Sequence, residues 1–167
     1  KTFNRASVDS RLIHCMTQDG WTDQGKRVMD GFNEAKEKKW SRAKGVSCHS
    51  LPALRDATAT DWTEVHLVRV NPQGNHMDGA ASDWNSQMRA DRAAPVMEQI
   101  KLAKAKGHGV IGMKILGNGD FKNPEDREKS IRFAMSCKDI DAVVIGFVTP
   151  KQVDEAIERI NRALAET

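Results

Sequence analysis

The stretch 142-AVVIGFVTPKQVDEAIERINRAL-164 shows how the chain is built. Residues 142–147 are a short apolar run, which is typical of a strand buried in a parallel sheet. Thr149 and Pro150 then fit the N-cap and the first position of a helix. The apolar positions of that helix fall on one stripe, which predicts core packing: Val153, Ala156, Ile157, Ile160 and Leu164.

Four similar units precede this one. Their apolar runs lie at 10–15, 43–47, 64–70 and 109–115, and a helical pattern follows each. Short strands that alternate with helices indicate an α/β fold with a parallel sheet. Right-handed crossovers allow such units to form a doubly wound sheet or an arc of a (β/α) barrel. No G-x-G-x-x-G motif follows the first strand, where a doubly wound dinucleotide fold would carry it, so the barrel is favoured.

Size and composition describe an ordinary globular chain. Its 167 residues predict a single domain, or part of one, over 1–167. The 26 basic and 23 acidic residues are intermixed, which argues against nucleic-acid binding. No apolar run approaches the roughly 20 residues that cross a bilayer, so we expect no membrane association. The N-terminus has no secretory signal pattern, and three scattered cysteines, Cys15, Cys48 and Cys137, fit a reducing cytoplasm.

A long connection lies between the third strand and the third helix-forming stretch. Residues 73–93 are rich in Gly, Asp, Asn and Ser, and they are longer than most loops in compact domains. We therefore interpret this segment as a loop over a site. Its large apolar side chains, Met77, Trp84 and Met88, either line a pocket or pin the loop in place.

Five segments taken in order resemble the aldo/keto reductases. They are 11-RLIHC-15, 45-GVSCHSLPAL-54, 68-VRVNPQG-74, 111-IGMKILGNG-119 and 143-VVIGFVTPKQVDEAI-157. The likeness is greatest to the bacterial branch whose fifth strand reads Gly-Val-Ser-Cys-His, and it runs from about Ala6 to Ala163. It implies an eight-stranded (β/α)8 TIM barrel, of which this chain supplies the fourth to eighth β/α units. It also implies reduction of a small-molecule aldehyde or ketone with a nicotinamide cofactor, usually NADP, with NAD as the alternative.

The resemblance assigns one catalytic residue. His14, at the end of the first strand, matches the family histidine that orients and polarises the substrate carbonyl. In the family a tyrosine, tuned by a lysine and an aspartate, donates the proton, and all three come from earlier strands. This sequence contains no tyrosine. The chain is therefore predicted to be the C-terminal part of a reductase or, alternatively, a non-catalytic cofactor-binding half-barrel.

The resemblance also implies a set of cofactor contacts. They divide into the nicotinamide end, the pyrophosphate turn and the adenosine end: Ser47 and Cys48; Lys114, Ile115, Leu116 and Gly117; Gly146, Phe147, Thr149, Gln152 and Glu155. Cys48 replaces the usual asparagine. Branches that prefer NADPH often carry Lys and Arg where this chain has Gly146 and Gln152, so the preference between NADH and NADPH stays open.

Simpler interpretations stand beside these. His14 fits a structural histidine, Lys114 a solvated lysine, and Gly117 a residue needed only for its turn. Cys15, Cys48 and His49 joining His14 around zinc is a further alternative, but adjacent pairs are not a chelating spacing, and we expect no metal. A partial barrel also leaves sheet edges open, which a homo-oligomer would cover.

Overall fold

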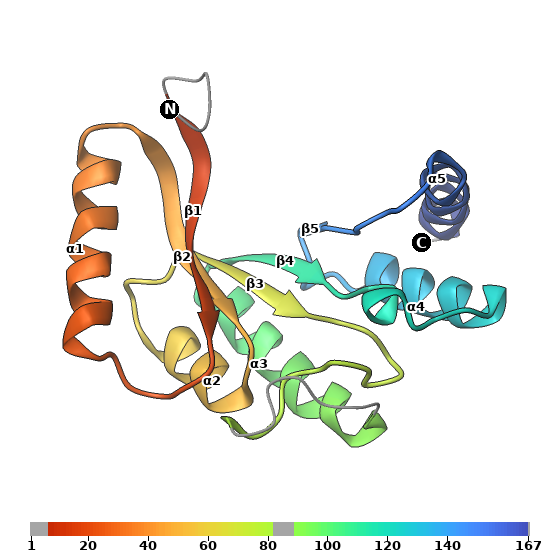
Figure 1. Cartoon of the computed structure of the whole chain (residues 1–167), viewed down its shortest axis with the longest axis horizontal. Coiled ribbons are helices and arrows are strands. Elements are labelled where there is room, and N and C mark those ends of the chain that lie inside the picture. The colour runs from red at the N-terminus through yellow and green to blue at the C-terminus, as the bar shows by residue number, and fades with distance from the viewer. Residues whose placement is uncertain (1–6, 82–88, 167) are drawn as a thin grey trace.

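The computed structural model describes residues 7–81 and 89–166. The strands are β1 (Val8–Met16), β2 (Ser41–Cys48), β3 (Val65–Arg69), β4 (Gly109–Met113) and β5 (Ala142–Val143). They form one parallel sheet in the order β1-β2-β3-β4-β5 (Figure 1). A doubly wound sheet reverses its strand order, whereas this order follows the sequence. Because every crossover then turns the same way, the helices cover one face, as in an arc of a barrel.

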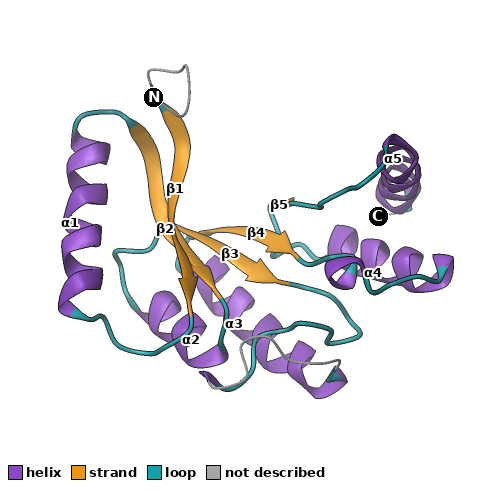
Figure 2. Cartoon of the chain, viewed as in Figure 1, coloured by secondary structure: helices purple, strands orange, loops and turns teal. Residues whose placement is uncertain are grey.

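The helices begin where the sequence carries start signals. They are α1 (Asp23–Glu37), α2 (Leu51–Ala59), α3 (Ala93–Ala105), α4 (Pro124–Ser136) and α5 (Pro150–Ala165), and short 3-10 turns lie at Ala90–Arg92 and Gly117–Gly119 (Figure 2). Side-chain oxygens cap three of them: Thr22 accepts from the Gly25 amide, Ser50 from Ala53, and Thr149 from Gln152. Among the described residues, no helix has the length and apolar character that a bilayer crossing requires.

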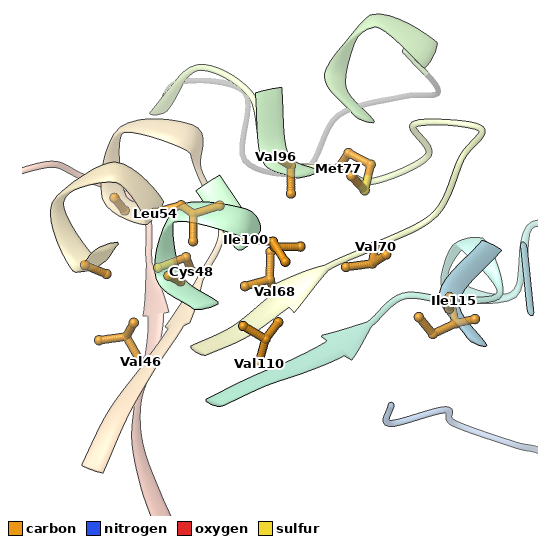
Figure 3. Close-up of a cluster of buried hydrophobic side chains, with 14 of the residues drawn as sticks. Val46, Cys48, Leu54, Val68, Val70, Met77, Val96, Ile100, Val110 and Ile115 are labelled. Atoms are coloured by element: carbon orange, nitrogen blue, oxygen red, sulfur yellow. The ribbon is translucent and has the colours of Figure 1, made fainter. Parts of the chain in front are cut away.

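The core lies between the sheet and helices α2 and α3 (Figure 3). Val46 of β2, His66 of β3 and Val110 of β4 are level with one another in the sheet, and all three are buried. Alternate residues of a strand face opposite sides. Gly45 and Ser47 lie on either side of Val46 in β2, so their side of the sheet is opposite to the core. The residues level with them in β3 and β4 therefore also face the inner side of the arc. Leu54 and Ile100 close the core from the helices.

Gly45 is required by a close approach between two strands. A Cβ atom built there would lie 1.8 Å from the Val65 carbonyl oxygen. No side chain can occupy that space, so only glycine keeps β2 and β3 paired at this level.

The last unit is less buried than the sequence predicts. β5 spans only two residues instead of 142–147, and Val144, Phe147 and Val148 are exposed. In α5, Ala156 is buried but Ile157 and Leu164 of the predicted core stripe are 52% and 53% exposed. The prediction assumed a neighbour on both sides of this unit. In the described part of the chain, no strand pairs with the outer edge of β5.

Candidate functional site

Basic side chains gather at the carboxyl ends of β1 to β4. The rings of His14 and His49 meet edge to face with centroids 5.8 Å apart. Burial, together with the nearby charges of Arg69, His14 and Lys114, lowers the pKa of His49 to about 4. These residues follow four different strands, so the sheet brings them to one edge. His49 is neutral at pH 7, and Lys114 adds a positive charge at this edge.

His14 lies where the sequence placed it. Ile13 packs against the core, and His14, the next residue, is exposed on the opposite side beside His49. The pairing of β1 with β2 shifts between Ile13 and Met16, and Cys15 there has a φ of 59°. This bulge bends β1 directly after His14. A hydrogen bond from the His49 amide to the Met16 carbonyl, 2.7 Å, then ties the two strand ends together.

Ser47 and Cys48 lie on opposite faces of β2. The Ser47 hydroxyl is 3.4 Å from Nε2 of His49, at the same edge as His14. Cys48 packs in the hydrophobic core, and burial raises the pKa of its thiol. Its side chain therefore cannot reach a ligand beside Ser47, which leaves only its backbone for a cofactor contact. The same placement removes Cys48 from the zinc alternative, and in the described residues no three His, Cys, Asp or Glu side chains converge on a metal position.

The loop after β3 is held in place by hydrogen bonds from Asn71. Asn71 donates from Nδ2 to the carbonyls of Asn75, 2.8 Å, and Lys114, 3.3 Å, and so joins the ends of β3 and β4. Met77 is fully buried in the core and does not line a pocket. Trp84 and Met88 lie outside the described residues. The first part of the predicted loop therefore packs against the ends of β3 and β4.

A buried ion pair holds this part of the loop against the end of β3. Nε of Arg69 lies 3.3 Å from Oδ1 of Asp78, and both side chains are almost completely buried. Arg69 also donates from Nη1 to the His76 carbonyl, 3.0 Å. Burial raises the pKa of Asp78 to about 7, although Arg69 and Arg92 act to lower it. This pair was not predicted, because its signal in the sequence is a charged residue inside the apolar run 64–70.

A cavity of about 630 Å³ opens between the end of β4 and the start of α5. Most of the predicted cofactor residues line it: Lys114, Ile115, Leu116, Gly146, Phe147, Gln152 and Glu155. Gly117 and Thr149 adjoin it without lining it, and Ser47 and Cys48 lie two strands away. The volume falls in the range of small-molecule and cofactor sites, roughly 300–1,000 Å³. The two glycines of the turn 117–119 keep positive φ angles, and a Cβ at Gly117 would collide with the Phe121 ring.

Three cationic residues in the cavity wall were not predicted. They are Lys122, Arg127 and Arg159. Glu155 joins two of them, because its Oε1 accepts from Nε of Arg127 at 2.8 Å and from Nε of Arg159 at 3.0 Å. These bonds lower the pKa of Glu155, so it stays ionised. The i, i+4 spacing of Glu155 and Arg159 is a readable signal, but nothing in the sequence shows that Arg127 reaches them from α4.

The N-terminus of α5 is closed by its own side chains. Thr149 accepts from the Gln152 amide, and the Gln152 side-chain oxygen accepts from the amides of Val148, 2.8 Å, and Thr149, 3.3 Å. This capping box uses donors that an anion would otherwise contact. The amides of Val148, Thr149 and Gln152 are therefore occupied by side chains of the same segment.

Comparison with solved structures shows the fold of aldo-keto reductases. Two structures of a candidate aldo-keto reductase from Pseudomonas aeruginosa match 95% of this chain and 53% of their own, with TM-scores of 0.67 and 0.65 at 15% and 16% identity. An aldo-keto reductase from Bacillus halodurans in its holo form matches 96% of this chain and 59% of its own, with a TM-score of 0.67 at 11% identity. No protein-family profile and no curated protein sequence matches the chain. The chain thus has the fold of about half of an aldo-keto reductase barrel and spans about half the length of these proteins.

Proposed function

We propose that the chain forms the cofactor-holding part of an NAD(P)H-dependent oxidoreductase that reduces an aldehyde or ketone. One observation carries the proposal: the cavity at the end of β4 collects residues from two of the three groups that the family resemblance assigns to the cofactor, the pyrophosphate turn and the adenosine end. The fold likeness to aldo-keto reductases supports it, since barrel enzymes bind their ligands at the carboxyl ends of the strands.

The residues present fit a dinucleotide in two respects. Lys114 and Lys122 provide positive charge on one wall, and Gln152 and Glu155 provide hydrogen-bonding groups on the other. Bound NAD(P)H would supply the hydride that is added to the carbonyl carbon.

The three cysteines of the described chain are free, which agrees with a cytoplasmic setting.

His14 would act on the carbonyl oxygen. It is exposed at the strand edge, and its neighbour His49 is neutral at pH 7, so an N–H group of His14 can donate a hydrogen bond to the carbonyl oxygen. Such a donor stabilises the negative charge that develops on oxygen as hydride arrives at carbon. The proton that completes the alcohol comes from His14 or from a group outside these 167 residues, because this sequence has no tyrosine.

Dinucleotide binding and turnover can be measured separately. We expect NADH or NADPH to quench the tryptophan fluorescence of the chain with a saturating curve, and a panel of aldehydes to be reduced with consumption of the cofactor. Binding without turnover would favour the non-catalytic half-barrel. Absence of binding for both dinucleotides would contradict the proposal altogether.

Replacing His14 tests its role. We expect His14→Ala to lower the rate of carbonyl reduction about 100-fold and to leave dinucleotide affinity nearly unchanged, since general acid–base and polarising groups contribute roughly 10²–10⁴-fold. Gln18→Ala, an exposed polar substitution just beyond the end of β1, is the control and should retain full activity. An unchanged rate in His14→Ala would remove this residue from the reaction.

A further inference from the structure

We infer that the cavity selects NADH over NADPH. This inference rests on the proposed function and concerns the two walls of the same cavity. The first wall is the turn after β4, with Lys114 and Lys122. The second is the segment that enters α5, with Gly146, Gln152 and Glu155.

The first wall provides charge for one phosphate group or one pyrophosphate. Nζ of Lys114 donates to Oδ1 of Asn118 at 2.6 Å, and Asn118 is neutral. Within residues 7–81 and 89–166, neither Lys114 nor Lys122 pairs with a carboxylate. The charge of Lys122 acts on the nearby Asp120 carboxylate and helps to lower its pKa, so Lys114 is the cation of this wall that best suits the pyrophosphate that both dinucleotides share.

The guanidinium groups of the second wall are already neutralised. Arg127 and Arg159 both donate to Oε1 of Glu155, and Arg159 also pairs with Glu128. Nη1 of Arg127 donates to the carbonyls of Phe121 and Lys122. Only 20% and 14% of the two arginine side chains is exposed. They form part of the packing between α4 and α5 and do not provide a surplus charge for a ligand.

The remaining groups of the second wall suit hydroxyls better than phosphate. Gly146 has no side chain, and the Gln152 oxygen is used to cap α5. Glu155 is a carboxylate, because its hydrogen bonds to the two arginines lower its pKa. A carboxylate accepts hydrogen bonds from a ribose diol and repels a phosphate on the same ring. NADPH differs from NADH by one such phosphate, so it would bring a second anionic group to a cavity with one cationic wall.

Titration of the two cofactors tests this directly. We expect NADH to bind at least about tenfold more tightly than NADPH when both are titrated into the whole chain in one buffer at pH 7.5, with heats or nicotinamide fluorescence as the readout. Equal affinity, or tighter binding of NADPH, would overturn the inference and leave the proposed function standing. Failure of both cofactors to bind would instead overturn the proposed function.

Charge added to the second wall should reverse the selection. We expect Gln152→Arg to tighten NADPH binding about tenfold relative to NADH binding. Gln24→Arg makes the same chemical change on the exposed surface of α1 and should affect neither cofactor. Gln152 also caps α5, so its replacement can disturb the helix start. Gly146→Lys serves as a second variant, because a Cβ at Gly146 meets no atom within 4 Å. If a folded Gly146→Lys variant leaves the NADPH affinity unchanged, the second wall does not lie near the extra phosphate and the inference fails.

Discussion

At the scale of single residues, His66 and His108 form a buried pair away from the candidate site. Nε2 of His66 lies 2.9 Å from Nδ1 of His108, and the rings stack with centroids 5.1 Å apart. Burial lowers the pKa of both, that of His66 to about 4. Nδ1 of His66 is buried without a hydrogen-bond partner in the described part of the chain. The pair is therefore stable only while uncharged.

This pair predicts a loss of stability in acid. The unfolded chain takes up a proton on His66 near its ordinary pKa of 6.5, but the folded chain does so only near 4. Stability from this residue is therefore complete above pH 6.5 and falls as the pH drops to 4, by about 3 kcal/mol at 1.36 kcal/mol per pKa unit. Urea unfolding at pH 7.5 and pH 4.5 measures the effect.

A variant isolates the contribution of His66. We expect His66→Leu to reduce the difference in unfolding free energy between the two pH values, while His14→Leu, at an exposed position, retains it. Asp78 acts in the opposite direction over the same range, because its pKa is raised to about 7. The test therefore compares the pH dependence of the unfolding free energy in His66→Leu with that of the wild-type chain. An equal pH dependence in His66→Leu and the wild-type chain would show that this ring is not responsible.

The sequence predicted some residues of the site and not others for a physical reason. Strand alternation and the family resemblance predicted that His14 lies at a strand end, where the structure has it, because both depend on neighbours along the chain. The same alternation shows that Cys48 faces the core, so its assignment to the cofactor overlooked the pattern. Arg69 and Arg127 were missed because their partners lie 9 and 28 residues away, at Asp78 and Glu155. Such pairs depend on how the elements pack.

At the scale of elements, the start of α5 depends on one threonine. Thr149 and Gln152 form a reciprocal capping box that satisfies the first amides of the helix. We expect Thr149→Ala to destabilise the chain by about 1 kcal/mol, whereas Thr149→Ser keeps the hydroxyl and should cost far less. Urea unfolding of the three proteins measures this. Equal losses for alanine and serine would indicate that the methyl group matters and the cap does not.

Element starts were predictable, and strand lengths were less so. Thr149 caps α5 as the sequence indicates, and Thr22 and Ser50 cap α1 and α2 in the same way, because a cap is formed within four residues. The length of β5 depends instead on what lies beside it. Only β4 pairs with it in the described chain, and the ladder stops after Val143, with one further hydrogen bond from the Val144 amide to the Gly112 carbonyl.

At the scale of the whole molecule, one sheet face and two sheet edges lack a cover in the described chain. A parallel sheet is normally covered on both faces, and an open edge can pair with another chain. Val144 and Val148 near the β5 edge are 51% and 91% exposed. We therefore expect the isolated chain to associate as its concentration rises.

Sedimentation velocity across a concentration series tests this expectation. We expect the double variant Val144→Lys and Val148→Lys to sediment as a monomer where the wild-type chain associates. Leu102→Lys, which replaces a 48% exposed leucine on α3, is the control and should associate like the wild type. Association that persists in the double variant would place the contact elsewhere on the molecule.

The order β1-β2-β3-β4-β5 also determines how the molecule comes apart. Each strand and helix unit adjoins the unit before it and the unit after it, so stability adds along a line, as in repeat proteins. Opening can therefore begin at an end and progress inward. In native-state hydrogen exchange we expect amides of β5 and α5 to exchange at a lower free energy than those of β3, which lies between two paired strands. A uniform exchange free energy from β1 to α5 would show instead that the arc unfolds as a single cooperative unit.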